Sequence, residues 1–89
     1  MKTAIREIIN KLGLHARAAA KLIQCANRFS SQIELHCNDK TGDAKSILGL
    51  MTLAAYQGTV VTITASGEDE TAAIEAITAL IDDFFGEGE

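Results

Sequence analysis

The strand pattern is clearest in Thr59-Val60-Val61-Thr62-Ile63-Thr64-Ala65, where β-branched residues hold almost every position. Such residues favour extended backbone on a half-buried sheet. Val61, Ile63 and Ala65 fall on one face because side chains alternate along a strand. Ser66-Gly67 follows and is typical of a turn. The segment therefore predicts a strand with one apolar face, which needs a second layer to cover it.

A helix that supplies such a cover is expected directly after this turn. Asp69 stands at an N-cap position, Glu70 adds negative charge to the first turn, and Gly86 is placed as a C′ glycine. Between these ends, apolar residues recur at the spacing of one helix face: Ala73, Ile74, Ile77, Ile81 and Phe84.

The rest of the chain repeats these two patterns. Further elements are expected as strands over Thr3–Ile9 and Gln32–Cys37, a short return strand framed by Asn38-Asp39 and Thr41-Gly42, and helices from Ala16 to about Arg28 and over Ile47–Leu53. The order is strand, helix, strand, strand, helix, strand, helix. One-sided strands with helices between them predict an α+β fold, an open-faced sandwich in which a four-stranded antiparallel sheet carries three helices on one face.

The bulk composition fits one domain over residues 1–89, because hydrophobic residues make up 47% of the chain and charged residues 22%. The formal net charge of −4 argues against nucleic acid as the main partner, since that role requires a basic surface. No apolar run approaches the roughly 18 residues of a membrane span, and the N-terminus lacks the apolar core of a signal peptide. We therefore expect a cytoplasmic protein without membrane insertion.

The two cysteines, Cys25 and Cys37, are expected to be buried thiols in a reducing compartment. Together with His15 and His36 they offer metal-binding side chains, but their spacing fits no zinc pattern. Neither a metal nor a cofactor is expected.

The segment Gly13-Leu14-His15-Ala16-Arg17 carries the strongest functional signal. It places a histidine where a helix begins, and the backbone N–H groups of Ala16, Arg17 and Ala18 have no intrahelical acceptor there. These donors and the helix dipole favour anions, phosphate above all. An imidazole nitrogen can attack phosphorus, and the Arg17 guanidinium offers donors that suit phosphoryl oxygens. The alternative is that His15 is an ordinary polar surface residue at a helix start.

Ser46 stands where an N-cap is expected, before a short helix rich in apolar residues. These apolar residues are more than one face of so short a helix can bury: Ile47, Leu48, Leu50, Met51 and Leu53. Part of the set is therefore expected to form an exposed interaction patch. Capping alone explains a serine at this point, so a further role for Ser46 stays open on the residues alone.

With these motifs in place, the chain resembles the histidine-containing phosphocarrier (HPr) family of the bacterial phosphoenolpyruvate-dependent phosphotransferase system. Asn10-Lys11-Leu12-Gly13-Leu14-His15-Ala16-Arg17 is similar to the active-site signature of that family. The segment from Asp43 to Leu53 is similar to a second signature around a regulatory serine, and Ala65–Glu70 resembles the segment that opens the last helix. Length and element order also agree, so the resemblance covers essentially the whole chain.

The resemblance implies a phosphocarrier rather than an enzyme, modified once per chain and acting as a monomer. It implies that His15 takes a phosphoryl group on Nδ1 from enzyme I and passes it to an enzyme IIA domain, while Arg17 helps to hold the phosphoryl oxygens. Ser46 corresponds to the serine that an HPr kinase/phosphorylase modifies in some bacteria. The residues expected to contact the partner proteins are Ala20, Ile47, Leu48 and Met51.

One residue departs from the family pattern, because Ala18 stands where proline usually follows the arginine. Proline lacks an N–H, so Ala18 adds one donor near the site. The departure leaves a nitrogen-linked or purely regulatory branch open beside a sugar-uptake branch. Two alternatives belong to other classes: a non-catalytic α+β binding module, which explains neither the second signature nor Arg17, and a small hydrolase with His15 as a base, which lacks a second catalytic group nearby in the sequence.

Overall fold

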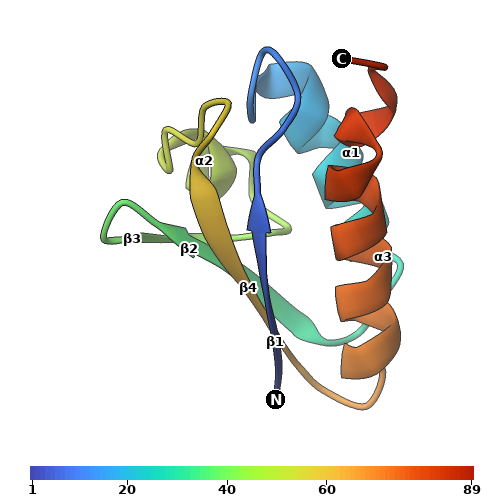
Figure 1. The fold of residues 1–89 in the computed structure, drawn as a ribbon. Coiled ribbons are helices and arrows are strands. Elements are labelled where there is room, and N and C mark those ends of the chain that lie inside the picture. The colour runs from blue at the N-terminus through green and yellow to red at the C-terminus, as the bar shows by residue number, and fades with distance from the viewer.

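The computed structural model describes residues 1–89, and its elements alternate as the sequence predicts. They are β1 (Lys2–Glu7), α1 (Ala16–Ala26), β2 (Gln32–Cys37), β3 (Lys40–Asp43), α2 (Ile47–Met51), β4 (Val60–Ser66), α3 (Glu70–Asp82) and a 3₁₀ turn η1 (Phe84–Gly86). Figure 1 shows the helices gathered on one side of the sheet and the C-terminus beside the start of α1.

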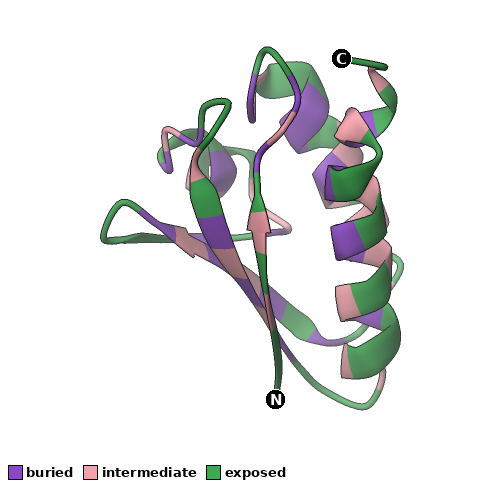
Figure 2. Ribbon diagram, viewed as in Figure 1, coloured by how far each residue is buried: buried purple, intermediate pink, exposed green.

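The strands form one antiparallel sheet in the order β1-β4-β2-β3. The clearest strand of the sequence is central, since β4 pairs with β1 on one side and with β2 on the other. Val61, Ile63 and Ala65 are fully buried on the face toward the helices, as predicted. Along β4 these buried residues alternate with more exposed ones (Figure 2). The predicted open-faced α+β sandwich is therefore confirmed.

The predicted boundaries are shifted by a residue or two at several ends. β1 ends at Glu7 rather than Ile9, and α1 ends at Ala26 rather than Arg28. Beyond β1, Ile8 still exchanges backbone hydrogen bonds with Gly58 and Thr59, and its side chain is fully buried. Packing thus continues past the end of the strand, which explains why the apolar pattern overestimates its length.

The turn between β2 and β3 has the geometry expected of its residues. Asn38 and Asp39 have φ of 52° and 61°, and they connect Cys37 to its ladder partner Lys40. Asparagine and aspartate tolerate this left-handed conformation, which matches the twist of a two-residue hairpin.

Asp69 precedes α3 as predicted, but the expectation that its side chain caps that helix is wrong. The carboxylate instead accepts hydrogen bonds from the Ser31 hydroxyl (2.5 Å), the Ser30 N–H (2.8 Å) and the Ser31 N–H (2.9 Å). These bonds, the Ser31 hydroxyl first, lower the pKa of Asp69 to about 2. Asp69 therefore ties the start of α3 to the segment that enters β2.

The end of α3 also differs from the prediction that its apolar face extends to Phe84. The helix ends at Asp82, and Phe84 and Phe85 have left-handed φ of 58° and 53°. This turn buries Phe85 completely and leaves Phe84 half-buried. Gly86 has a φ of 75°, so it is left-handed as predicted, but it is the last residue of η1 rather than the residue directly after α3.

The prediction of two buried thiols is correct for Cys37 and wrong for Cys25, which is only partly buried. Both cysteines are free, and burial raises the pKa of each above its ordinary value. No group of three or more His, Cys, Asp or Glu side chains is arranged to hold a metal ion.

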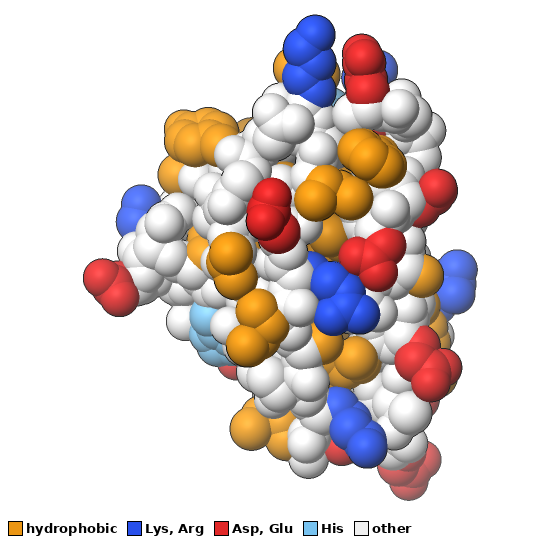
Figure 3. All heavy atoms as spheres, viewed as in Figure 1, with side chains coloured by type: hydrophobic (Ala, Val, Ile, Leu, Met, Phe, Trp, Pro, Cys, Tyr) orange, Lys and Arg blue, Asp and Glu red, His pale blue; other side chains and the backbone are white.

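The surface carries charges of both signs. On the face shown in Figure 3, acidic and basic side chains are interspersed with apolar ones, and no large area of one sign is visible. None of the helices has both the length and the apolar character needed to cross a membrane.

Candidate functional site

His15 is held at the start of α1 by the loop that precedes it. The Leu14 N–H donates to the Ala55 carbonyl at 2.8 Å, and Gly13 has a left-handed φ of 69°. A Cβ at Gly13 would lie 2.8 Å from both the Ala55 oxygen and Tyr56 Cα, closer than real contacts allow. Because Gly13 has no Cβ, the loop before α1 can pack closely against the loop that contains Ala55 and Tyr56. This packing fixes the position of His15.

The first turn of α1 presents unpaired donors next to the imidazole, as the sequence predicts. His15 is the N-cap residue, and the Ala19 N–H to the His15 carbonyl (2.8 Å) is the first intrahelical bond. The N–H groups of Ala16, Arg17 and Ala18 thus have no acceptor within the helix. Ala16 and Arg17 are exposed, whereas Ala18 is fully buried, so its N–H lies beneath the surface that the other two present.

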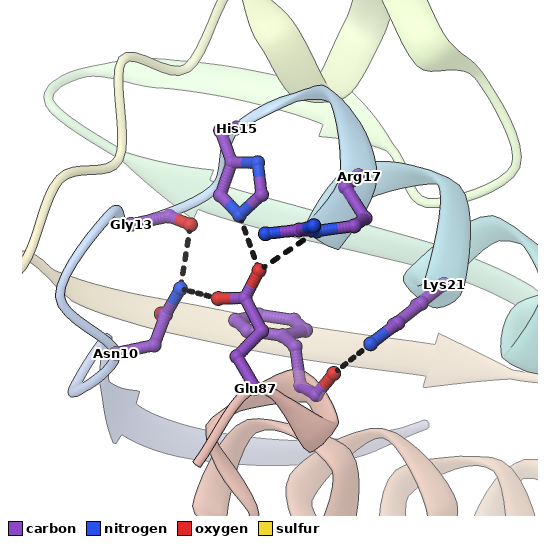
Figure 4. Close-up of polar contacts among 7 residues, drawn as sticks. Asn10, Gly13, His15, Arg17, Lys21 and Glu87 are labelled. Atoms are coloured by element: carbon purple, nitrogen blue, oxygen red, sulfur yellow. Dashed lines mark hydrogen bonds and ion pairs between the residues drawn. The ribbon is translucent and has the colours of Figure 1, made fainter. Parts of the chain in front are cut away.

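A carboxylate from the other end of the chain reaches this histidine. Glu87 Oε2 lies 2.5 Å from His15 Nε2 and 3.4 Å from Arg17 Nε, while Glu87 Oε1 accepts a 2.8 Å hydrogen bond from Asn10 Nδ2 (Figure 4). The Glu87 side chain is only 8% exposed, although it belongs to the terminal segment. One acidic side chain therefore connects the signature loop, the histidine and the arginine.

The contact assigns a proton to the histidine ring. Burial alone would raise the pKa of Glu87, but hydrogen bonds from Asn10 and His15 and the charges of His15 and Arg17 outweigh it and lower the pKa below its ordinary value. An ionised carboxylate can only accept hydrogen bonds, so the hydrogen between the two groups belongs to Nε2. In the neutral ring Nδ1 then carries the lone pair, and it makes no hydrogen bond of its own.

Asn10 holds the two sides of the site together. Its side chain is fully buried, and Nδ2 donates to the Gly13 carbonyl as well as to Glu87, both at 2.8 Å. Its Oδ1 has no hydrogen-bond partner. Both donor hydrogens are therefore committed to fixing the loop and the carboxylate.

Ser46 caps α2 as predicted, since its Oγ accepts a hydrogen bond from the Gly49 N–H at 3.1 Å. The apolar residues around it divide into two sets. Leu50 and Leu53 are fully buried, whereas Ile47, Leu48 and Met51 are 44%, 75% and 42% exposed. The expectation that part of this set stays exposed is confirmed.

Ala20, the other residue expected at the partner surface, is exposed on α1, and α1 packs against α2. The helix that begins at His15 is therefore a packing neighbour of the helix that carries Ile47, Leu48 and Met51.

Two residues of the site cannot be predicted from the sequence. Asn10 belongs to the signature, but its side-chain contacts depend on how the loop closes. A glutamate after Gly86 has no pattern that relates it to a histidine 72 positions earlier, so the sequence gives no signal for Glu87. Only the left-handed turn at Phe84 and Phe85 brings it there.

Comparison with known proteins identifies the relatives of this chain. The family model for the PTS HPr component phosphorylation site matches residues 3–83. Phosphocarrier protein HPr of Cupriavidus necator is 56% identical over 82 residues, which are 92% of each chain. HPr of Neisseria meningitidis is 53% identical over 83 residues, which are 93% of each chain.

The fold comparison agrees with these relatives. The crystal structure of HPr-C-His from Thermoanaerobacter tengcongensis superposes with a TM-score of 0.94 at 50% sequence identity, with 98% of both chains covered. Sequence and structure agree over nearly the full length, and the chain therefore belongs to the HPr family of phosphocarrier proteins of the phosphotransferase system.

Proposed function

We propose that His15 Nδ1 accepts a phosphoryl group from phosphorylated enzyme I and passes it to an enzyme IIA domain. The observation that carries the proposal is the state of the imidazole ring. Nε2 is engaged by Glu87, so Nδ1 is the one ring nitrogen free to act as a nucleophile, and it stands at the start of a helix with unpaired donors.

Donors suited to phosphoryl oxygens lie near the imidazole. Ala16 and Arg17 expose the helix-start backbone, and the Arg17 side chain is 67% exposed. Its contact with Glu87 is through Nε, so the terminal guanidinium nitrogens remain free to bind an anion. Such a site holds the phosphoryl group by hydrogen bonds without locking it in place. That balance suits a carrier, because tight ground-state binding slows onward transfer.

The docking surface for both partner proteins is proposed to be the exposed apolar patch next to this site, formed by Ala20, Ile47, Leu48 and Met51. Three of these side chains are large, apolar and exposed, and soluble proteins rarely leave such groups uncovered without a partner. One patch beside His15 can serve successive partners, because each must bring its own phosphoryl site to the same nitrogen.

Ser46 is proposed as a regulatory phosphorylation site for an HPr kinase/phosphorylase in hosts that have this enzyme. Its hydroxyl lies at the first turn of α2, and the residue is partly exposed. Phosphate at a helix start is compatible with the fold, whereas its negative charge beside Ile47 and Leu48 would disfavour an acidic docking partner. Regulation then follows from a local change of charge.

A labelling experiment with a histidine control tests the phosphocarrier proposal. The protein is incubated with phosphoenolpyruvate and enzyme I, and the phosphate bound per chain is measured after acid and base treatment. We expect one acid-labile, base-stable phosphate, abolished in His15→Ala and unchanged in His36→Ala. His36 is the only other histidine, and it lies on the sheet, bonded to Thr41 and Thr64. Full labelling of His15→Ala would overturn the proposal.

The same labelled protein can then be offered to enzyme IIA domains of the sugar-uptake and nitrogen-linked types, and the faster acceptor identifies the branch served. For Ser46, incubation with ATP and an active HPr kinase should give an acid-stable phosphate that is lost in Ser46→Ala and kept in Ser66→Ala. Failure to label with a kinase that modifies another HPr would contradict the regulatory role.

A further inference from the structure

The segment after α3 is folded in a way that local preferences do not explain. Phe84, Phe85 and Gly86 all have left-handed φ, at 58°, 53° and 75°. Two bulky residues in this conformation are unfavourable, and they persist only where the surrounding contacts over-determine them. Phe85 supplies one such contact through complete burial, and Lys21 Nζ supplies another by donating to the Phe85 carbonyl at 2.8 Å.

This turn brings the Glu87 carboxylate to His15. The Glu87 N–H donates to the Phe84 carbonyl at 2.9 Å, and the Glu87 side chain points toward the start of α1 (Figure 4). There the carboxylate receives hydrogen bonds from Asn10 and His15 and faces Arg17 (Figure 4). A glutamate side chain is ordinarily solvated unless it is paired, so the burial of Glu87 against the imidazole calls for a reason beyond solubility.

We propose that Glu87 is a positioning residue for phosphoryl transfer at His15: its carboxylate fixes the orientation and tautomer of the ring and stabilises the positive charge that the ring carries while it is phosphorylated. The proposal rests on the proposed function, and it adds a residue from the opposite end of the chain to the machinery. A Ser-His-Asp triad uses the same principle, because its carboxylate binds one ring nitrogen of the histidine and thereby orients the other nitrogen for catalysis.

The charge balance of the transfer explains why a carboxylate is useful at Nε2. The Nδ1 lone pair attacks phosphorus, the new P–N bond forms, and the bond from phosphorus to the donor breaks with its electron pair leaving on the donor. The proton on Nε2 stays in place, so the phosphorylated ring is cationic and faces the anionic Glu87. In the onward step a nucleophile of the acceptor protein forms a bond to phosphorus while the P–N bond breaks. The electron pair of the P–N bond returns to Nδ1, which leaves readily because the phosphorylated ring is cationic and becomes a neutral imidazole.

Glu87 also orients Arg17. The guanidinium is held through Nε at 3.4 Å from Glu87 Oε2, the same oxygen that contacts the imidazole, and this contact limits the side chain to positions near the ring (Figure 4). Arg17 is thereby held near the imidazole before a phosphoryl group arrives, which lowers the cost of ordering a long and exposed side chain during the transfer.

A kinetic comparison of three variants tests the proposal. The initial rate of phosphorylation by phosphoenolpyruvate and limiting enzyme I is measured for Glu87→Ala, Glu87→Gln and Glu89→Gln. We expect a loss of about tenfold for Glu87→Ala, since a charge-assisted hydrogen bond is worth about that factor over none. Glu87→Gln keeps an acceptor without the charge and should recover part of the rate. Glu89→Gln removes the same charge from the same segment and should remain within about twofold of the wild type.

NMR of the His15 ring nitrogens provides a second measurement. A residue with only a structural role would not change the protonation or hydrogen bonding of Nε2. In ¹⁵N-histidine-labelled wild type, the Nε2–H of His15 should be protected from exchange and hydrogen-bonded. In phosphorylated protein, Nε2 should keep its proton to higher pH in the wild type than in Glu87→Gln. Circular dichroism melting confirms that each variant is folded.

The possible results separate this proposal from the one it rests on. If His15→Ala still labels, the phosphocarrier assignment fails whatever Glu87 does. If His15→Ala is unlabelled while Glu87→Ala keeps the wild-type rate and ring titration, only the role of Glu87 fails. A faster rate in Glu87→Ala would also overturn it, because the carboxylate would then compete with the incoming phosphoryl group.

Discussion

Replacing Phe85 with alanine tests whether the terminal segment is anchored through the core. The side chain is fully buried and is the only aromatic ring with no exposed surface. Truncating a buried phenylalanine costs about 3–5 kcal/mol, which combines the lost transfer free energy with the cavity left behind. We therefore expect Phe85→Ala to lower the free energy of unfolding by at least about 3 kcal/mol.

The Phe85→Ala variant also has a second route, because the segment that follows α3 can detach from the core rather than leave a cavity. Detachment gives up about 2 kcal/mol of ring burial. It also gives up the hydrogen bonds that Lys21 and Asn10 make to the segment, at a net value of about 1 kcal/mol each. The two routes lead to losses of similar size. For a chain of this length the melting temperature should fall by about 12 to 24 °C.

The assay is urea unfolding followed by circular dichroism, with Phe84→Ala as the matched control. Phe84 has the same side chain and the same left-handed backbone, but it is only partly buried, so its truncation should cost about 1 kcal/mol. Phe85→Ala should also reproduce the slow phosphorylation of Glu87→Ala, since the anchor sets the position of the carboxylate. Equal losses of stability in the two phenylalanine variants would refute the assignment of Phe85 as the anchor.

Three further perturbations address other parts of the fold. Gly13→Ala should lower the melting temperature and slow phosphorylation, because the added Cβ meets the Ala55 carbonyl at 2.8 Å; wild-type values in both assays would contradict the loop packing. The Ser31 hydroxyl holds the pKa of Asp69 at about 2, below the ordinary 3.8, so its stabilisation is complete above about pH 4 and is lost as the pH falls toward 2. The difference in unfolding free energy between wild type and Asp69→Asn should therefore shrink over that interval, and a constant difference between pH 2 and 5 would be inconsistent with it. Ser46→Ala should lower the free energy of unfolding by about 1 kcal/mol through loss of the cap, measured by urea unfolding, and no change would mean that the cap does not stabilise α2.

Features set by neighbouring residues could be predicted from the sequence. The alternation in β4, the turn at Asn38-Asp39 and the cap at Ser46 each depend on residues within a few positions, and the structure has all three. The position of His15 at a helix start belongs to the same class, because the pattern that begins at Ala16 is local.

Features that depend on distant partners could not be predicted in the same way. Asp69 has the sequence position of a helix cap, yet its carboxylate accepts hydrogen bonds from Ser30 and Ser31. These residues lie 39 and 38 positions earlier in the chain. Phe84 continues the helical spacing, but Phe85 is the residue that is buried in the core. Which of the two is buried depends on the packing of the completed fold. The site predicted from the sequence lacks Glu87 for this reason, since the Glu87 side chain reaches His15 only when Phe85 is the buried residue.

The left-handed turn at Phe84 and Phe85 places two fixed points two residues apart, one in the core and one at the imidazole. The number of residues between them matters as much as their identity. Inserting or deleting one residue in this interval would turn the carboxylate away from His15 even if every side chain were kept. Among proteins that share this arrangement, the segment between Asp82 and Glu87 should therefore tolerate changes of residue type far better than changes of length.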